Sequence, residues 1–229
     1  MPLDIPRIQA LIFDVDGTLS DTDDRMADQV ARLANLIRWT LPSRDPKRFA
    51  RWFVMALETP GNFIYGLPDR LNIDNRLSRL SSSLARLGWG HKSPDFWIIP
   101  QVRPCLERLY ARYPLAVASA RDERSTHVFL EQYQLRPYFK AIATALTCEH
   151  TKPYPHPIRW AAEQIGVPPA ACLMIGDTTV DIRAGRAAGA QTVGVLCGFG
   201  QENELRRAGA DLIIPSTAHL AGILLGDQE

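Results

Sequence analysis

Four groups of polar residues, each placed after a short apolar run, have the types and spacing that phosphate chemistry requires. The groups are Asp14-Val15-Asp16-Gly17-Thr18, Ser119-Ala120-Arg121, Lys152 in Thr151-Lys152-Pro153, and Gly176-Asp177 with Asp181. Packed carboxylates repel one another and tend to protonate unless positive charge lies among them, and Lys152 and a divalent cation could supply that charge. Magnesium prefers oxygen ligands and keeps positions open for phosphate oxygens. Hydrolysis of a phosphate ester needs such charge neutralisation together with a positioned nucleophile and an acid, and the four groups contain these parts.

Short apolar runs that alternate with amphipathic stretches predict the elements that must position these groups. We expect strands at 8–13, 115–118, 141–145, 172–175, 192–196 and 212–214. We expect helices that begin at Arg103-Pro104 and that cover 123–133, 156–165, 179–188, 201–208 and 217–224. Nearly continuous apolar runs are typical of strands covered on both faces. The pattern predicts an α/β fold with a Rossmann-like, doubly wound parallel sheet, whose carboxyl edge would gather the polar groups.

The segment 21–94 interrupts this alternation, because it contains apolar residues at helical spacing and no convincing strand. We therefore predict an α/β core of residues 1–20 and 95–229, with residues 21–94 inserted as an α-helical cap domain. Lys47, Arg48 and Arg51 form a polar helix face that could contact substrate, although a solvated face is the interpretation that we favour. The loop 58–66, with Asn62 and Tyr65, is a candidate for substrate specificity from its position alone.

Composition excludes several other classes of protein. The 229 residues carry a formal net charge of +1, which gives no indication of nucleic-acid or membrane partners. No apolar window approaches the roughly 20 residues of a spanning helix, and the N-terminus lacks a signal-peptide pattern. We expect a soluble cytoplasmic protein, a monomer or a homodimer, that acts on a small molecule. The four cysteines form no CxxC pair and are typical of buried free thiols rather than of a zinc site or a disulfide framework.

Taken together and in order, the four groups resemble the motifs of the haloacid dehalogenase superfamily. The run Phe13–Leu19 resembles the first motif, Ser119 the second, Lys152 the third, and Gly176-Asp177 with Asp181 the fourth. The inserted segment is similar in position and helical character to that family's C1-type cap. The stretch from Gly198 to Asp211 resembles the phosphoglycolate phosphatase-like branch.

The resemblance implies a role for each residue that matches a motif. Asp14 would attack phosphorus and become an aspartyl phosphate, Asp16 would act as general acid and then general base, and Lys152 would neutralise charge. Thr18 and Ser119 would hold phosphate oxygens. We also expect Ala120 and Arg121 in the substrate-binding group, although Arg121 is a departure from the family's second motif, which often continues with asparagine or glycine. A magnesium ion would be held by Asp14, the Asp16 carbonyl and Asp177, with Asp181 as a direct or water-mediated support.

The function implied is magnesium-dependent hydrolysis of a small phosphate monoester, of the phosphoglycolate or sugar phosphate class. A phosphomutase of the beta-phosphoglucomutase type would use the same motifs, and a non-catalytic binding or regulatory protein on this fold is a further alternative. Asp16 argues against the true dehalogenases, which lack an aspartate at this place and use no metal.

Each residue also has a simpler structural interpretation. The stretch from Asp14 to Thr18 could be a plain turn, Ser119 could cap the next helix, and Lys152 could be solvated. Asp177 could be the N-cap of helix 179–188, with Asp181 in its first turn. Arg121 could contact substrate or form a salt bridge at the surface. We interpret Gly194 to Gly200 as a loop, since it lacks a dinucleotide-binding pattern.

Overall fold

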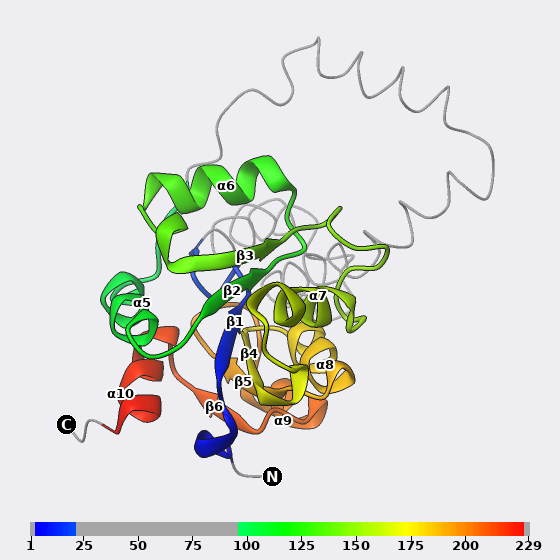
Figure 1. The fold of residues 1–229 in the computed structure, drawn as a ribbon. Coiled ribbons are helices and arrows are strands. Elements are labelled where there is room, and N and C mark those ends of the chain that lie inside the picture. Colours follow the sequence, from blue (N-terminus) through cyan, green and yellow to red (C-terminus); the bar gives the residue numbers. More distant parts are fainter. Residues whose placement is uncertain (1–2, 22–95, 227–229) are drawn as a thin grey trace, which may run out of the picture.

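The computed structural model describes residues 3–21 and 96–226, which form a parallel sheet between layers of helices (Figure 1). The strands are β1 (Ala10–Phe13), β2 (Leu115–Ala118), β3 (Phe139–Ala143), β4 (Cys172–Gly176), β5 (Gln191–Val195) and β6 (Leu212–Ile214). Their order in the sheet is β3-β2-β1-β4-β5-β6, and every pairing is parallel. The chain therefore winds outward from β1 in both directions. The predicted Rossmann-like, doubly wound α/β core is confirmed.

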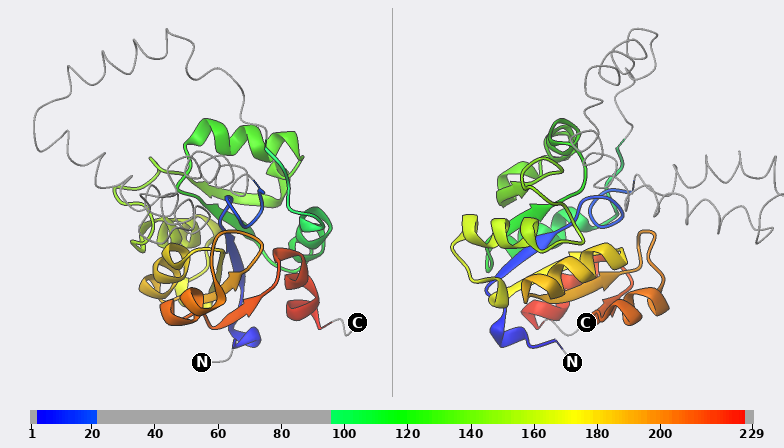
Figure 2. Two further views of the ribbon diagram at one scale, coloured as in Figure 1. Left: turned by 180° about the vertical axis from the view of Figure 1, so that it is seen from behind. Right: turned by 90° about the vertical axis from the view of Figure 1, so that its right-hand side faces the viewer.

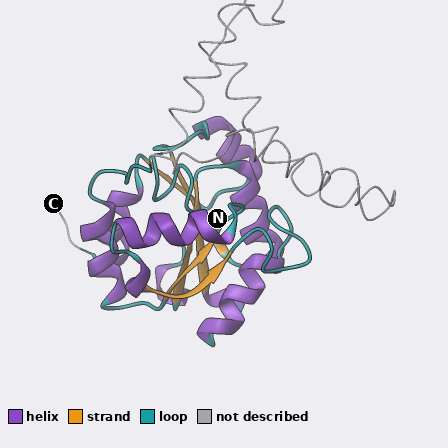
Figure 3. Cartoon of the chain, turned by 90° about the horizontal axis from the view of Figure 1, so that it is seen from above, coloured by secondary structure: helices purple, strands orange, loops and turns teal. Residues whose placement is uncertain are grey.

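The helices cover both faces of the sheet, as the side view and the view from above show (Figures 2 and 3). They are α5 (Val102–Tyr110), α6 (Glu123–Gln132), α7 (His156–Ile165), α8 (Thr179–Ala188), α9 (Glu202–Ala208) and α10 (Leu220–Leu225). Because strand side chains alternate between faces, Leu11 and Phe13 join a core cluster with side chains of α5, α6 and α10. Ala10 and Ile12 join a second cluster with side chains of α7 and α8.

Three predicted elements differ from the structure by two residues or more. The first strand begins at Ala10 rather than at residue 8. The third strand lies at Phe139–Ala143 rather than at 141–145, because Phe139 is buried beside Phe13, with ring centroids 6.2 Å apart. The helix expected at 217–224 is a short 3-10 helix (Thr217–His219) followed by α10. The buried Thr217 hydroxyl donates a hydrogen bond to the Thr18 carbonyl at 2.7 Å, so this turn anchors the loop after β1.

The chain approaches and leaves the segment 22–95 through two adjacent stretches beside β1. The amide of Asp21 donates to the Trp97 carbonyl at 2.7 Å, and the amide of Ile99 donates to the Leu19 carbonyl at 3.0 Å. The predicted cap helices, the basic residues 47, 48 and 51, and the loop 58–66 lie outside the described residues. The domain boundary at 20/21 and 94/95 therefore stays a prediction.

Two expectations from composition can be compared with the described residues. Cys105, Cys148, Cys172 and Cys197 are all free, and Cys105 and Cys172 are buried. The other two cysteines are half-buried. Among residues 3–21 and 96–226, no helix has both the length and the apolar character that crossing a membrane would require.

The packing of α8 on the sheet generates a prediction about stability. Gly185 faces the sheet so closely that an added Cβ would lie 2.6 Å from Thr192 Cγ2 and 2.9 Å from Met174 Cβ. Alanine favours a helix by about 1 kcal/mol over glycine. We nevertheless expect Gly185→Ala to lower the free energy of unfolding by about 1–3 kcal/mol, since overpacking outweighs propensity. Denaturant unfolding measures this change.

The exposed residue Ala187 in the same helix provides the control. Ala187→Gly should cost only about 1 kcal/mol, the difference in helix propensity. A stabilised Gly185→Ala variant would contradict the close packing of α8 on the sheet.

Candidate active site

The predicted polar groups meet at the carboxyl edge of the sheet because neighbouring strands end there in register. Asp14 directly follows β1, and its amide donates to the Ile175 carbonyl at 2.9 Å. Ser119 directly follows β2, and its amide donates to the Ala143 carbonyl at 2.9 Å. These backbone bonds continue the sheet by one residue, so the side chains start from fixed backbone positions.

Lys152 lies inside this edge, in contact with two carboxylates. Its Nζ is 2.7 Å from Asp14 Oδ1 and 2.5 Å from Asp181 Oδ1. The Lys152 side chain is 3% exposed, so the interpretation of a solvated lysine is wrong. Burial disfavours the charged amine, but the carboxylates of Asp14 and Asp181 outweigh it and raise the pKa of Lys152. The lysine is therefore a fixed positive charge beside Asp14.

The pKa of Asp14 is raised in spite of this lysine. Burial, followed by the negative charges of Asp181 and Asp16, raises the pKa of Asp14 from its ordinary value of 3.8 to about 7, although Lys152 acts in the opposite direction. A carboxyl with this pKa is only partly ionised near neutral pH, whereas a nucleophilic carboxylate must be ionised. Further positive charge at this edge would favour the reactive form.

The carboxylates fit a hard divalent cation. Asp14, Asp177 and Asp181 are all buried, and each offers one oxygen within 4.8 Å of the oxygens of the other two. An all-oxygen donor set of this kind is what magnesium prefers. Burial, followed by the charges of Asp181 and Asp16, raises the pKa of Asp14, and a cation bound here would oppose this shift by favouring the ionised carboxyl.

The oxygens of Asp177 and Asp181 differ in how they are already engaged. Asp177 accepts a hydrogen bond from the Phe199 amide at 2.8 Å and a long one from the Thr18 hydroxyl at 3.4 Å. Asp181 accepts from Lys152 with one oxygen, and from the amide and hydroxyl of Thr178 with the other, at 3.1 and 2.7 Å. Both carboxylates are therefore held by neighbouring donors, and Asp181 is held by the Lys152 amine as well.

Thr178, rather than Asp177, is the N-cap of α8. The alternative in which Asp177 caps this helix is wrong, because its carboxylate turns toward the 198–200 loop instead. Asp181 lies in the first turn, as that alternative expected, and reaches back to Thr178.

The glycine-bearing loop after β5 takes part in the site, which the sequence analysis did not identify. A Cβ on Gly198 would overlap the Asp177 carboxylate and the Gly17 carbonyl, and a Cβ on Gly200 would overlap the Asp177 carbonyl. These two glycines allow the loop to approach closely enough for the Phe199 amide to bind Asp177. The two glycines on either side of Phe199 were visible in the sequence. Their role became clear only when the fold showed that this loop lies against Asp177.

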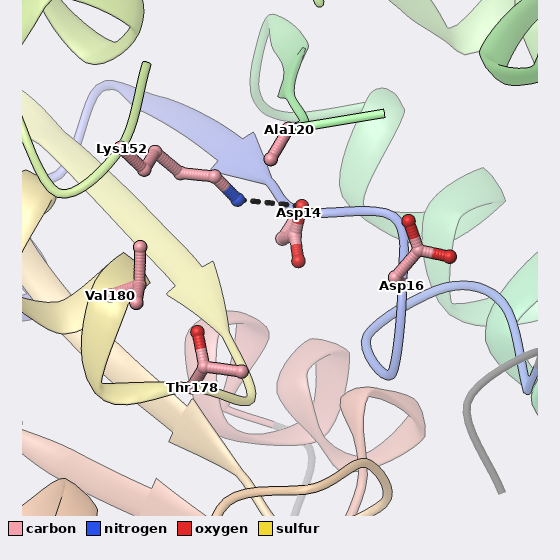
Figure 4. A pocket seen from close by; sticks show the side chains of 6 residues that line it. All are labelled: Asp14, Asp16, Ala120, Lys152, Thr178 and Val180. Atoms are coloured by element: carbon pink, nitrogen blue, oxygen red, sulfur yellow. Dashed lines mark ion pairs between the residues drawn. The ribbon is translucent and has the colours of Figure 1, made fainter. Parts of the chain in front are cut away.

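A small pocket opens between these groups (Figure 4). It is lined by Asp14, Asp16, Ala120, Lys152, Thr178 and Val180. Four of these were expected from the motifs, whereas Thr178 and Val180 were not. Both lie at the start of α8, close to the predicted metal ligand Asp177, so this helix start forms part of the pocket wall.

Thr18 and Ser119, the predicted ligands of phosphate oxygens, lie beside the pocket in buried positions. The Thr18 hydroxyl points to Asp177, and the Ser119 hydroxyl accepts a hydrogen bond from the Arg121 amide at 3.1 Å. Asp122, rather than Ser119, caps α6, since its carboxylate accepts from the Ser125 amide at 3.0 Å. The capping interpretation of Ser119 is therefore wrong, and its phosphate-binding role stays a prediction.

Arg121 forms an ion pair with Asp16 rather than with a surface group. Nε donates to Asp16 Oδ2 at 3.0 Å, and a second guanidinium nitrogen contacts Oδ1. The Arg121 side chain is only 10% exposed, so the salt bridge that it forms is largely buried. The alternative that placed this salt bridge at the surface is wrong. In Figure 4 the Asp16 carboxylate points away from Asp14.

The raised pKa of Asp14 predicts a pH dependence of stability when no divalent cation is bound. Between pH 4 and 7 the native carboxyl keeps a proton that the unfolded chain has lost, so wild-type stability falls as pH rises through this window. Asp14→Asn removes that titration. Its free energy of unfolding, minus that of the wild type, should increase by a few kcal/mol from pH 4 to pH 8.

Denaturant unfolding with a chelator at several pH values measures this difference. Asp122→Asn is the control, because a hydrogen bond from Ser125 lowers the pKa of Asp122 and keeps its titration below this window. A difference between Asp14→Asn and wild type that stayed constant from pH 4 to pH 8 would contradict the raised pKa.

Comparison with known proteins agrees with this geometry. Residues 11–195 match the family model of the haloacid dehalogenase-like hydrolases. A phosphoglycolate phosphatase of Chromobacterium violaceum is 29% identical over 97% of this chain and 99% of its own. A pyrophosphatase of Bacillus velezensis is 28% identical over 82% of this chain and 83% of its own.

A solved haloacid dehalogenase-like hydrolase of Streptococcus pneumoniae shares the fold. Its TM-score is 0.68 at 21% identity, over 95% of this chain and 99% of the other. The predicted α/β fold and the predicted phosphatase class are confirmed by these matches. With the motif residues assembled at one sheet edge and a family model that spans most of the chain, the protein belongs to the haloacid dehalogenase-like hydrolase family.

Proposed function

We propose that this enzyme hydrolyses a small-molecule phosphate monoester, of the phosphoglycolate or sugar phosphate class, through an aspartyl phosphate on Asp14 with magnesium as cofactor. The observation that carries the proposal is the contact of Lys152 with both Asp14 and Asp181 inside a buried group of carboxylates. Such a group combines a nucleophile with the positive charge that a phosphoryl group needs. The names of the relatives support the substrate class.

The first step transfers the phosphoryl group to the enzyme. An oxygen of Asp14 forms a bond to phosphorus while the bond between phosphorus and the ester oxygen breaks. The departing oxygen takes a proton from the carboxyl group of Asp16, so that an alcohol leaves instead of an alkoxide. Lys152, at 2.7 Å from Asp14, neutralises charge on the attacking carboxylate and on the phosphoryl oxygens.

The second step returns Asp14 to its starting form. Asp16, now a carboxylate, accepts a proton from a water molecule whose oxygen attacks phosphorus. The bond between Asp14 and phosphorus then breaks, and inorganic phosphate is released. One group thus serves as acid and then as base.

Asp14 and Asp177, with the Asp16 carbonyl, are the groups that would hold magnesium, and Asp181 would support it. When bound, magnesium would supply positive charge that favours ionised Asp14 and stabilises the charge on phosphate oxygens. Thr18 and Ser119 are proposed to orient the phosphate. We also retain the predictions of a cytoplasmic location, of a monomer or homodimer, and of no nucleic-acid or membrane partner.

Phosphate release from a panel of small phosphate esters tests the function. We expect release by the wild type with magnesium, and a loss of at least about 10³-fold with chelator or in Asp14→Asn, because the nucleophile cannot be replaced. Glu163→Gln on the exposed side of α7 is the matched control and should keep full activity. Conversion of a hexose phosphate to an isomer without phosphate release would indicate a mutase instead.

Thermal unfolding with and without magnesium tests the cofactor separately from turnover. Magnesium at about 100 times its dissociation constant should stabilise the wild type by roughly 2.7 kcal/mol. Asp177→Asn removes a carboxylate ligand and should lose most of this shift, whereas Glu163→Gln should keep it. An equal magnesium shift in all three proteins would exclude Asp177 as a ligand.

A further inference from the structure

We propose that Arg121 is the positioning residue of Asp16, holding the carboxylate of the general acid–base group in a fixed orientation at the edge of the pocket. The inference rests on the proposed function, because it assigns Asp16 the proton transfers described above. It goes beyond the predicted substrate-binding role of Arg121, since Arg121 would act through Asp16 and not on the ester itself.

The contact between the two side chains is bidentate. Arg121 Nε donates to Asp16 Oδ2 at 3.0 Å, while a terminal nitrogen of the same guanidinium contacts Oδ1. A planar guanidinium that engages both oxygens of the ionised Asp16 carboxylate restricts its rotation. In the protonated carboxyl, one oxygen keeps the contact with Arg121 while the other carries the proton that the leaving oxygen takes. The side chains of Arg121 and Asp16 are 10% and 21% exposed, so water competes little for this contact.

The guanidinium is itself held by aromatic rings. Its central carbon lies 4.5 Å from the centroid of Phe96 and 5.9 Å from that of Phe129. These two rings pack edge to face at 5.9 Å, and both are buried. Cation–π contacts of this kind favour a fixed position of the guanidinium. The group that orients Asp16 is thus anchored by the core instead of by solvent.

The backbone around Arg121 and Phe96 is fixed as well. The Arg121 amide donates to the Ser119 hydroxyl at 3.1 Å, and the Arg121 carbonyl accepts from the Ala145 amide at 3.0 Å. The Phe96 carbonyl accepts from the Tyr133 hydroxyl at 2.7 Å. These bonds hold the backbone from which the Arg121 side chain starts and the backbone of the ring on which its guanidinium lies.

The pocket lining supports an indirect role. Asp16 and Ala120 line the pocket, whereas Arg121 reaches Asp16 from the side that faces Phe96 and Phe129. Figure 4 shows the Asp16 carboxylate directed to the side opposite Asp14. If Arg121 acts only through Asp16, its replacement should slow the step in which Asp16 protonates the leaving oxygen. Steps that need no proton from Asp16 should keep their rates.

Leaving-group chemistry separates this role from substrate binding. The leaving group of an alkyl phosphate is a strongly basic alkoxide, so its departure depends on a proton from the general acid. The leaving group of 2,4-dinitrophenyl phosphate is a stable anion that needs no proton. The rate of alcohol or phenol release in a single turnover reports the first step alone. It can therefore be measured even in variants that cannot complete the second step.

The experiment compares single-turnover release by the magnesium-loaded wild type, Arg121→Met, Asp16→Asn and the double variant. The two probes are the alkyl phosphate that the wild type hydrolyses fastest and 2,4-dinitrophenyl phosphate. Methionine keeps an unbranched apolar side chain next to Phe96 and Phe129 but removes the charge and the donors. Arg124→Met, the same substitution at an exposed position of α6, is the matched control and should leave both rates unchanged.

We expect Arg121→Met to slow alkyl release by about 10- to 100-fold, part of the contribution of a general acid. Release of dinitrophenol should stay within about twofold of wild type, and the double variant should match Asp16→Asn within about twofold, since the two residues act as one unit. The KM for the alkyl ester, measured separately under steady-state turnover, should change little. Arg121→Lys, which cannot make a bidentate contact, should lose most of the alkyl rate while keeping the positive charge.

Equal losses for both esters, or losses that add to those of Asp16→Asn, would overturn the proposal and assign Arg121 to the substrate. An unchanged or faster alkyl rate would overturn it too. Thermal unfolding checks that the variants are folded, and if Arg121→Met is not, Arg121→Lys decides by the same comparison. A wild type that releases product from neither probe nor from any ester of the panel would refute the proposed function itself, and this proposal with it.

Discussion

The burial of several carboxylates at one edge of the sheet is the constraint on which the rest of the structure depends. Asp14, Asp177 and Asp181 lie within reach of one another and almost out of contact with water. Such a group is unfavourable unless positive charge and hydrogen-bond donors surround it. Lys152 supplies positive charge, while burial and the charges of Asp181 and Asp16 still raise the pKa of Asp14. The oxygens of the three carboxylates could together hold a divalent cation.

The donors come from different segments, and each fixes one carboxylate. The amide of Phe199 reaches Asp177 because the flanking glycines carry no side chain, and the N-cap of α8 binds Asp181. These contacts hold the acidic groups in place before any ligand arrives, which is how preorganised sites stabilise charge without reorganisation. The same helix start contributes Thr178 and Val180 to the pocket, so the element that fixes the acids also shapes the space beside them.

The two cations of the site have different chemistry, and the structure uses each accordingly. Lys152 places a compact charge between the carboxylates of Asp14 and Asp181. An ammonium group can contact both because its donors are not confined to one plane. Arg121 offers a flat group to both oxygens of Asp16, and its central carbon lies over the aromatic ring of Phe96. A point charge suits the neutralisation of Asp14, whereas a planar contact suits the orientation of a group that must exchange a proton in a defined direction.

The sequence by itself determined the fold class and the identity of the principal residues, because apolar runs, strand ends and the order of the polar groups are local features. It therefore predicted Asp14, Asp16, Lys152 and Asp177 at one edge, and all of them lie there. Only the tertiary structure decided which groups touch. The contact of Arg121 with Asp16 spans 105 positions in the chain, and that of Phe199 with Asp177 spans 22. The shift of β3 likewise depends on the packing of Phe139 against Phe13, a contact between residues far apart in sequence that no local pattern records.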